Sequence, residues 1–272
     1  MDMLRMDSPD SWTLVLRVGY DGGAYSGFAE QKDDVKTVAG ELRRAIEVFL
    51  RRPVDLTCAG RTDAGVHAQS QYVSFPAFPE ELDIPRCRWI RAMDALLPRD
   101  ITVNGVFRAG ASFSARFDAL SRTYVYRIVD SDLRPLQTRS FVWWHRFPLD
   151  DAAMNVAASY LIGEQDFKSF CKVSSAVGKS TCRNVISASL SRQQEFGEDI
   201  LAFRIQGNAF LHNMVRSIVG TLVEVGMHRK DPEWVRDVIA ARDRQAAGPT
   251  APASGLTFVD VEYPASALIS LE

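Results

Sequence analysis

A carboxylate between two glycines is the most chemically suggestive feature of this sequence. Asp63 lies at the centre of the string G-R-T-D-A-G-V-H-A, residues 60–68. Gly60 and Gly65 free the backbone on either side, and small neighbouring residues leave room for a bulky planar group to approach the carboxylate. Arg61 is near enough to pair with Asp63, to keep it ionised or to hold an anion beside it. The string is a candidate catalytic loop, although a hairpin turn with a surface ion pair explains the same spacing equally well.

Aromatic and arginine residues are interleaved in a second region, residues 113–127. Arg116 lies in the run F-S-A-R-F-D-A, and Tyr124 in the run R-T-Y-V-Y-R that follows it. This mixture suits stacking on unpaired bases together with contacts to phosphates. A buried strand with solvated arginines gives the same pattern, because Tyr124 and Tyr126 share one strand face, and the pattern alone favours that alternative.

The third candidate is an arginine within an apolar segment. Apolar residues at helical spacing between positions 210 and 223 cover most of a helix surface, so that helix must be largely buried. Arg216 therefore needs a carboxylate or phosphate partner, unless its side chain extends to the surface. Gly220 lies one turn further on and allows another backbone to approach closely.

Other reaction classes find little support. The sequence contains no H-E-x-x-H or G-x-S-x-G motif, and its four histidines are scattered, so we expect neither a metal nor a cofactor. His67 is more readily a structural hydrogen-bond partner than a base. A glycoside hydrolase needs a second carboxylate; Asp21, Asp94 and Asp118 are conceivable, but no motif singles them out.

Hydrophobic periodicity predicts two successive sets of strands and helices. The first set has the order β-α-β-β-α-β of a ferredoxin-like unit, and the second repeats it. Strands are expected at residues 11–18, 54–59, 69–75, 101–109, 123–129, 141–145, 184–192, 200–205 and 256–263. Helices are expected after Thr37 and Pro85 and at residues 150–161, 210–225 and 232–241, with Thr37 and Asp150 as the N-caps of the helices that they begin,. A polar loop is expected at 193–199. We therefore expect an α+β fold of two ferredoxin-like lobes, residues 1–110 and 111–272, whose antiparallel sheets flank a central cleft.

Composition indicates an ordinary globular chain of 272 residues, 46% hydrophobic and 24% charged,. No apolar run is long enough to span a membrane, and the acidic N-terminus lacks the features of a signal peptide, so we expect a cytoplasmic protein. The cysteines are Cys58, Cys87, Cys171 and Cys182. They are few and irregularly spaced, which predicts reduced, buried thiols.

Net charge at first sight disfavours a nucleic-acid partner, because the formal charge is −2 and the pI about 6.1,. The distribution is uneven. Residues 86–146 hold 11 Arg and no Lys against 5 Asp, a local excess of +6. Arginine is the better side chain for gripping phosphates and stacking on bases, although a high arginine content also fits a solvated surface.

Taken together, these segments resemble the tRNA pseudouridine synthase A family. The resemblance extends from about residue 14 to residue 263. Its motifs are G-R-T-D-A-G-V-H-A, A-R-F-x-A followed by R-x-Y-x-Y, F-L-x-x-M-V-R-x-I-V-G, and a C-terminal A-P-A-x-G-L. Residues 20–30 are similar to the family's Y-D-G-x-x-Y-x-G-W-Q, but Phe28, Ala29 and Glu30 stand where the family has Trp, Gln and often a basic residue.

The resemblance implies an isomerase with a pseudouridine synthase fold that converts uridine to pseudouridine in the anticodon stem-loop of tRNA, at positions 38–40. It also implies a homodimer that grips one tRNA and uses no cofactor. Asp63 is then the catalytic residue, Arg216 pairs with it, and Arg61 assists. The same motifs supply the candidate substrate-binding residues, which are Tyr124, Arg116, Tyr25 and His67.

Two other functions remain open. One is a catalytically silent tRNA-binding or tRNA-folding protein of the same fold, which an intact Asp63 disfavours. The other is a carboxylate-dependent hydrolase of a small nucleoside, which would release free uracil and ignore tRNA.

Overall fold

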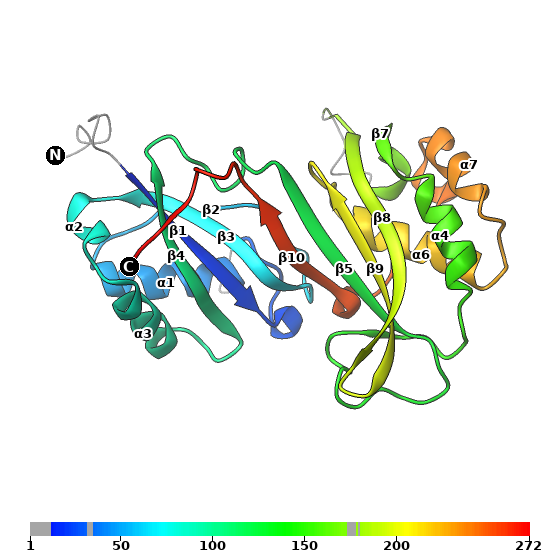
Figure 1. Cartoon of the computed structure of the whole chain (residues 1–272), viewed down its shortest axis with the longest axis horizontal. Coiled ribbons are helices and arrows are strands. Elements are labelled where there is room, and N and C mark those ends of the chain that lie inside the picture. The colour runs from blue at the N-terminus through cyan, green and yellow to red at the C-terminus, as the bar shows by residue number, and fades with distance from the viewer. Residues whose placement is uncertain (1–11, 32–34, 173–177, 179) are drawn as a thin grey trace. The chain divides into compact units, whose positions relative to one another are not determined.

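Two compact units make up the described part of the chain. The computed structural model describes residues 12–31, 35–172, 178 and 180–272, and its elements are mixed α and β (Figure 1). Residues before 121 together with residues 259–272 form the first unit, and residues 121–258 form the second. No helix among the described residues is both long and apolar enough to cross a membrane.

The first unit is organised around an antiparallel sheet. Its strand order is β11-β4-β1-β3, and β2 also pairs with β3. The central strand β1 is almost entirely buried, as its run of apolar residues predicts,. The strands are β1 (Trp12–Tyr20), β2 (Thr57–Cys58), β3 (His67–Ala77), β4 (Ile101–Gly110) and β11 (Ile269–Ser270). The predicted strand at 54–59 is shorter in the structure because Val54 donates its N–H to Glu47 instead of to a strand.

The helices of the first unit are α1 (Val38–Leu50), α2 (Pro79–Leu82) and α3 (Arg86–Leu96). α1 and α3 lie side by side against the sheet (Figure 1). As predicted, Thr37 caps α1, and its side chain accepts the Gly40 N–H at 3.3 Å,. Trp89 on α3 is fully buried, and its ring meets that of the partly buried Phe49 on α1 edge to face at 4.8 Å,.

The chain segment 111–120 belongs to the first unit, not to the second as predicted. Ala115 donates its N–H to the Ser74 hydroxyl at 3.0 Å, and its carbonyl accepts from the Tyr263 hydroxyl at 2.6 Å. The Leu120 N–H donates to the Glu262 carbonyl at 2.8 Å. These contacts are long-range in sequence, so no local pattern places the boundary after residue 120.

The second unit also has a helix-covered sheet, with strand order β5-β9-β8-β7 and β6 added parallel to β5. The strands are β5 (Ser121–Val129), β6 (Trp143–Trp144), β7 (Gly163–Asp166), β8 (Cys182–Glu195) and β9 (Glu198–Gly207); β10 (Leu256–Glu262) begins in this unit. The helices are α4 (Asp151–Ser159), α6 (Met214–Gly226) and α7 (Trp234–Ala241), and α4 contacts both others and β8. Asp150 caps α4, as predicted. Short 3-10 helices are η1 (Gly22–Ala24), η2 (Lys168–Phe170), η3 (Arg244–Ala246) and η4 (Ala253–Gly255).

Helix α6 begins later than the apolar periodicity predicts. Asn213 adopts a left-handed conformation, with φ of 63°, and the first helical residue is Met214 rather than Phe210. The apolar residues at 210 and 211 continue the pattern without continuing the helix. From Met214 onward, 11 of the 13 helical residues are buried, which confirms the predicted interior position,.

The predicted polar loop at 193–199 is almost entirely strand. β8 and β9 extend to Glu195 and Glu198 and are joined by a two-residue turn. Phe196 and Gly197 both have positive φ, 52° and 80°, as a tight turn between twisted strands requires. The polar side chains misled the prediction because they face solvent from an extended hairpin.

All four cysteines are free, in agreement with the prediction, but two of them are not buried. Cys171 is buried and Cys58 partly so, whereas Cys87 and Cys182 are exposed. Cysteine count and spacing predicted the redox state, but they do not determine exposure.

Replacement of Gly220 by alanine is expected to destabilise the second unit. A Cβ at this position would lie 1.7 Å from the carbonyl oxygen of Pro249, so the backbone must move, at a cost of about 1–3 kcal/mol. That cost exceeds the gain of about 1 kcal/mol in helix propensity. Urea unfolding measures the change. Gly110→Ala is the control, because its Cβ would meet nothing within 4 Å. An unfolding midpoint for Gly220→Ala equal to that of the wild type would contradict the packing argument.

Candidate active site

The Asp63 loop, residues 60–66, leaves β2 and enters β3 in the first unit. Its entry is fixed by the side-chain amide of Gln71, which is fully buried. Gln71 donates to the Gly60 carbonyl at 2.6 Å and accepts the Gly60 N–H at 3.3 Å. A buried amide with both ends satisfied by one backbone unit holds that unit in a single position. The sequence analysis did not identify Gln71, because an isolated glutamine in a strand carries no signal.

The residue before Asp63 is held from two directions. The hydroxyls of Thr62 and Tyr20 are buried and share a hydrogen bond of 2.7 Å. The Thr62 carbonyl accepts the N–H of Phe28 at 3.1 Å. Burial raises the pKa of Tyr20 well above its usual value, against smaller opposing effects of hydrogen bonds to Thr62 and Gln71. The tyrosine therefore stays protonated and keeps this hydrogen bond near neutral pH.

Asp63 itself begins a tight turn, in which its carbonyl accepts the Val66 N–H at 3.1 Å. Gly65 has a φ of 77°, a conformation that favours glycine,. Thr62 and Val66 on either side are buried, whereas Asp63 is only partly buried. The backbone is thus fixed while the residue that carries the carboxylate remains partly open to solvent.

The N-terminal loop, residues 20–30, packs behind the Asp63 loop. A Cβ on Gly22 would lie 2.0 Å from the Val66 carbonyl oxygen, and one on Gly27 would lie 3.0 Å from that of Thr62. Both glycines are therefore required by close backbone approach. Phe28, which departs from the family pattern, is buried and lies 6.0 Å from the Tyr20 ring. The further departure at Glu30 forms an ion pair with Arg43 on α1.

Tyr25 and His67 both fasten the N-terminal loop. The Tyr25 hydroxyl donates to Asp100 at 2.5 Å, and its ring is buried. His67 is also buried, with its Nδ1 at 3.1 Å from the Gly22 nitrogen and 3.0 Å from an oxygen of Asp21. Nδ1 accepts from Gly22 when the ring proton is on Nε2, and a protonated Nδ1 would donate to Asp21 instead. In either state His67 is a hydrogen-bond partner within this loop.

Two exposed arginines lie near the base of the Asp63 loop. Burial raises the pKa of the Cys58 thiol, and the positive charges of Arg61 and Arg116 act to lower it. The two guanidinium groups are therefore close enough to Cys58 to influence it. Arg116 also lies 5.3 Å from the ring of Phe117, which is 79% exposed. This corner of the first unit offers positive charge and an accessible aromatic ring.

In the second unit, Tyr124 lies in an aromatic cluster. Its ring stacks on Phe258 at 4.7 Å, with the planes inclined by 23°, and meets Phe210 edge to face at 5.1 Å. Contacts of this kind fix the orientation of a ring. Tyr124 is 7% exposed, so only a small part of it remains available to a ligand.

Arg216 is oriented by its own helix and by the segment 248–251. Its Nε donates to the Ala251 carbonyl at 2.8 Å, and one terminal nitrogen donates to the side-chain oxygen of Asn213 at 3.1 Å. The Arg216 carbonyl accepts the Ala251 N–H at 3.1 Å. Both acceptors are neutral, and these two hydrogen bonds orient the guanidinium. Asn213 is a second residue that the sequence did not mark, because its left-handed conformation is seen only in the structure.

The predicted site residues thus divide between the units. Asp63, Arg61, Arg116, Tyr25 and His67 belong to the first, and Tyr124 and Arg216 to the second. In the described residues, no cluster of three or more His, Cys, Asp or Glu side chains could hold a metal ion.

Comparison with known proteins gives consistent matches. A family model described as tRNA pseudouridine synthase matches residues 157–264. A tRNA pseudouridine synthase A from Francisella tularensis (strain SCHU S4 / Schu 4) is 41% identical over 251 residues, which cover 92% of this chain and 93% of that protein. The protein of the same name from Coxiella burnetii (strain Dugway 5J108-111) is 37% identical with the same coverage. A solved Cbf5-Nop10-Gar1 complex aligns with a TM-score of 0.34 at 15% identity, over 86% of this chain and 60% of that one; similarity this low carries no argument.

Loss of the Tyr20 hydroxyl is expected to loosen the Asp63 loop. Tyr20→Phe leaves the buried Thr62 hydroxyl without this partner, which costs about 1–3 kcal/mol. Urea unfolding measures the stability, and amide hydrogen exchange at residues 60–66 reports the loop, where protection should fall. Tyr160→Phe is the control, since its hydroxyl makes only an exposed, 3.3 Å contact with Glu233. Unchanged stability and protection in Tyr20→Phe would show that the hydrogen bond does not hold the loop.

Proposed function

This chain belongs to the tRNA pseudouridine synthase A family, and on that premise we propose that it isomerises uridine to pseudouridine in tRNA with Asp63 as the catalytic carboxylate. The observation that supports this role is the loop geometry. The backbone before Asp63 is fixed by hydrogen bonds of the buried Gln71, Tyr20 and Thr62 side chains. Gly65 after it donates its N–H to the Tyr25 carbonyl at 3.3 Å, while Asp63 stays partly open. Preorganisation of this kind lets a side chain act on a bound substrate without first being ordered.

The reaction requires the uridine to leave its stack, because its glycosidic bond is inaccessible inside a helix. Asp63 initiates cleavage of the bond between N1 and C1′. The uracil then turns, C5 bonds to C1′, the proton on C5 is lost and N1 gains one. Substrate and product contain the same atoms, and no oxidant or acceptor group takes part.

Arg216 is proposed as the cationic partner of Asp63. Its guanidinium is oriented by Asn213 and Ala251, and a guanidinium beside a carboxylate stabilises the ionised form of that carboxylate. Arg61 adds positive charge near the base of the same loop.

Tyr124 is proposed to lie against the extruded base, with its ring fixed by Phe258 and Phe210. Arg116 is proposed to contact RNA phosphates, since it is exposed beside an accessible aromatic ring. For Tyr25 and His67, the hydrogen bonds to Asp100 and Gly22 favour support of the Asp63 loop over direct contact with the substrate.

We further propose that the units are ferredoxin-like lobes that flank the tRNA-binding cleft. The strand order β4-β1-β3, with β2 on β3, supports this for the first unit, and the order β5-β9-β8 supports it for the second. By family resemblance, the target uridines are those at positions 38–40 of the anticodon stem-loop, and the active enzyme is a homodimer.

Asp63→Ala is expected to abolish product formation and to leave tRNA binding intact. The rate should fall by more than about 10³-fold, because the acid–base group at the reacting bond is removed. Tritium release from tRNA labelled at uridine C5 measures the reaction, and filter binding measures affinity. Asp94→Ala, an exposed carboxylate on α3, is the matched control and should keep full activity. Residual turnover in Asp63→Ala would refute the assignment. Binding without product in the wild type would identify the silent tRNA-binding protein, and free uracil would identify the hydrolase.

Transcripts with cytidine in place of uridine at positions 38–40 are expected to release no tritium. The same substitution in the acceptor stem should leave release unchanged, because those uridines are not targets. Mass spectrometry of nuclease fragments locates the product in the unaltered transcript. Pseudouridine found elsewhere would preserve the activity and contradict the proposed positions.

A further inference from the structure

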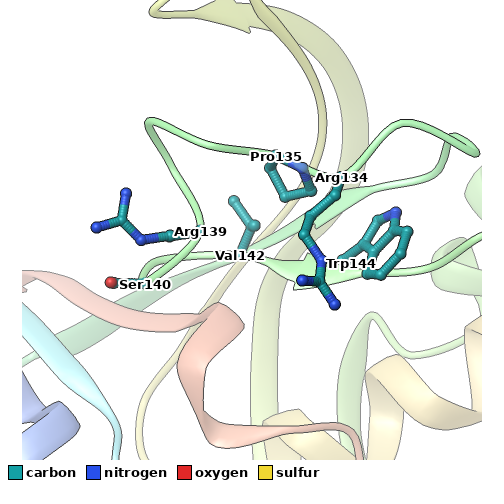
Figure 2. Close-up of a pocket in the computed structure, with 6 residues that line it drawn as sticks. All are labelled: Arg134, Pro135, Arg139, Ser140, Val142 and Trp144. Carbon is teal, nitrogen blue, oxygen red and sulfur yellow. The ribbon is translucent and has the colours of Figure 1, made fainter.

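A hollow of about 420 Å³ lies in the second unit, and none of the residues assigned above lines it. Its lining comes from the connection between β5 and β6 and from β6 itself (Figure 2). The size is within the range of sites that hold small groups such as a nucleotide. The lining residues are Arg134, Pro135, Arg139, Ser140, Val142 and Trp144.

The hollow is strongly basic. Arg134 and Arg139 belong to its lining, and the neighbouring Arg146 lies over Trp144. All three arginines are exposed. Within the described part of the chain, none of the three forms an ion pair with a carboxylate. In a protein of net charge −2, such a concentration of uncompensated positive charge points to an anionic ligand.

The guanidinium groups are held in place by stacking. Those of Arg134 and Arg146 lie 5.0 Å and 4.9 Å from the centre of the Trp144 ring, whose Nε1 donates to the Ser131 carbonyl at 2.9 Å. Stacking uses the flat face of each guanidinium and leaves its N–H edges for an acceptor. The third arginine, Arg139, donates to the Leu136 carbonyl at 2.6 Å.

The loop that carries these arginines is preorganised by one carboxylate. Glu198 accepts the N–H groups of Leu136, Gln137 and Thr138 at 2.6, 3.0 and 3.1 Å, and the Thr138 hydroxyl as well. The Thr138 hydroxyl and these N–H groups lower the pKa of Glu198 to about 2, so the carboxylate is ionised near neutral pH. A loop ordered before binding loses little entropy when a ligand arrives.

The hollow is connected to the Arg216 region through the segment 251–254. Ser254 donates to the Val142 carbonyl at 3.2 Å, and Tyr126 donates to the Pro252 carbonyl at 2.8 Å. The adjoining Ala251 carbonyl is the acceptor of Arg216. The basic hollow and the proposed catalytic arginine therefore share one supporting segment.

We propose that this hollow binds the phosphodiester backbone of the tRNA substrate at nucleotides other than the target uridine. The proposal rests on the proposed function, because it names a further contact surface for the same RNA. Three arginine edges around one hollow match the geometry of phosphate oxygens. Leu133 and Leu136 on the same loop are 76% and 64% exposed. Exposed apolar side chains also suit contact between two copies of this chain, so a second copy is the competing occupant.

The test removes the three positive charges without removing side-chain bulk, in Arg134→Gln/Arg139→Gln/Arg146→Gln. The KM for tRNA should rise at least tenfold, while kcat stays within twofold, because none of the three arginines is assigned to the reacting bond. The slope of log affinity against log salt should fall by about 2, since roughly 0.7–0.9 counterions are released per phosphate contact. The matching triple lysine variant should recover most of the slope, because it restores charge.

The control removes equal charge from the helical layer, in Arg229→Gln/Arg236→Gln/Arg242→Gln, and should leave KM and the salt slope unchanged. Equal effects of both glutamine variants would overturn the proposal in favour of non-specific attraction. Unchanged RNA affinity with an altered sedimentation mass would overturn it in favour of contact between copies. If the triple glutamine variant keeps the KM and salt slope of the wild type while turnover is intact, this proposal fails and the proposed function stands. If the wild type binds tRNA without turnover, only the proposed function fails.

Discussion

The structure depends on the buried hydrogen bonds that fix the backbone around Asp63. Gln71 holds Gly60 at the entry of the loop, and the hydroxyls of Tyr20 and Thr62 hold the residue immediately before the carboxylate. Each of these groups is buried, so each hydrogen bond that is lost leaves an uncompensated polar atom in the interior. The loop therefore has one favourable arrangement, and its partly exposed carboxylate is a fixed feature of the surface. The glycines of residues 20–30 serve the same purpose, because only they allow a second backbone to approach this closely.

Much of the fold could be predicted from local patterns. Thr37 and Asp150 are side-chain caps, and both helices begin where the sequence says. Gly220 allows the close approach that its position implied. Patterns failed where backbone conformation and solvent exposure, more than residue type, decide the outcome. The apolar run from Phe210 predicted a helix start that the left-handed Asn213 overrules. The polar residues 193–199 suggested a loop, because an exposed hairpin and an irregular loop can carry the same polar residues.

The candidate site shows the same division. A motif marks Asp63, Arg216 and Tyr124, since their residue types and neighbours are unusual. The residues that support them carry no such mark. Gln71 is an ordinary strand residue, and Asn213 acquires its role from a backbone conformation that the sequence does not reveal. Tyr25 was expected to bind substrate by resemblance, yet its hydroxyl donates to Asp100 and its carbonyl accepts the N–H of Gly65 in the Asp63 loop. Residue types and motifs therefore identify reactive groups more readily than they identify the residues that hold those groups in position.

The division of the first unit between the two ends of the chain has a consequence for biosynthesis. Its sheet includes β11, and the Arg86 N–H donates to the carbonyl of Glu272 at 2.8 Å. The second unit consists of one uninterrupted segment, residues 121–258. During translation, every residue of the second unit has been polymerised before the first unit receives its last strand. The later segment can therefore complete its core first, and the sheet that carries the Asp63 loop gains its edge strand β11 only afterwards.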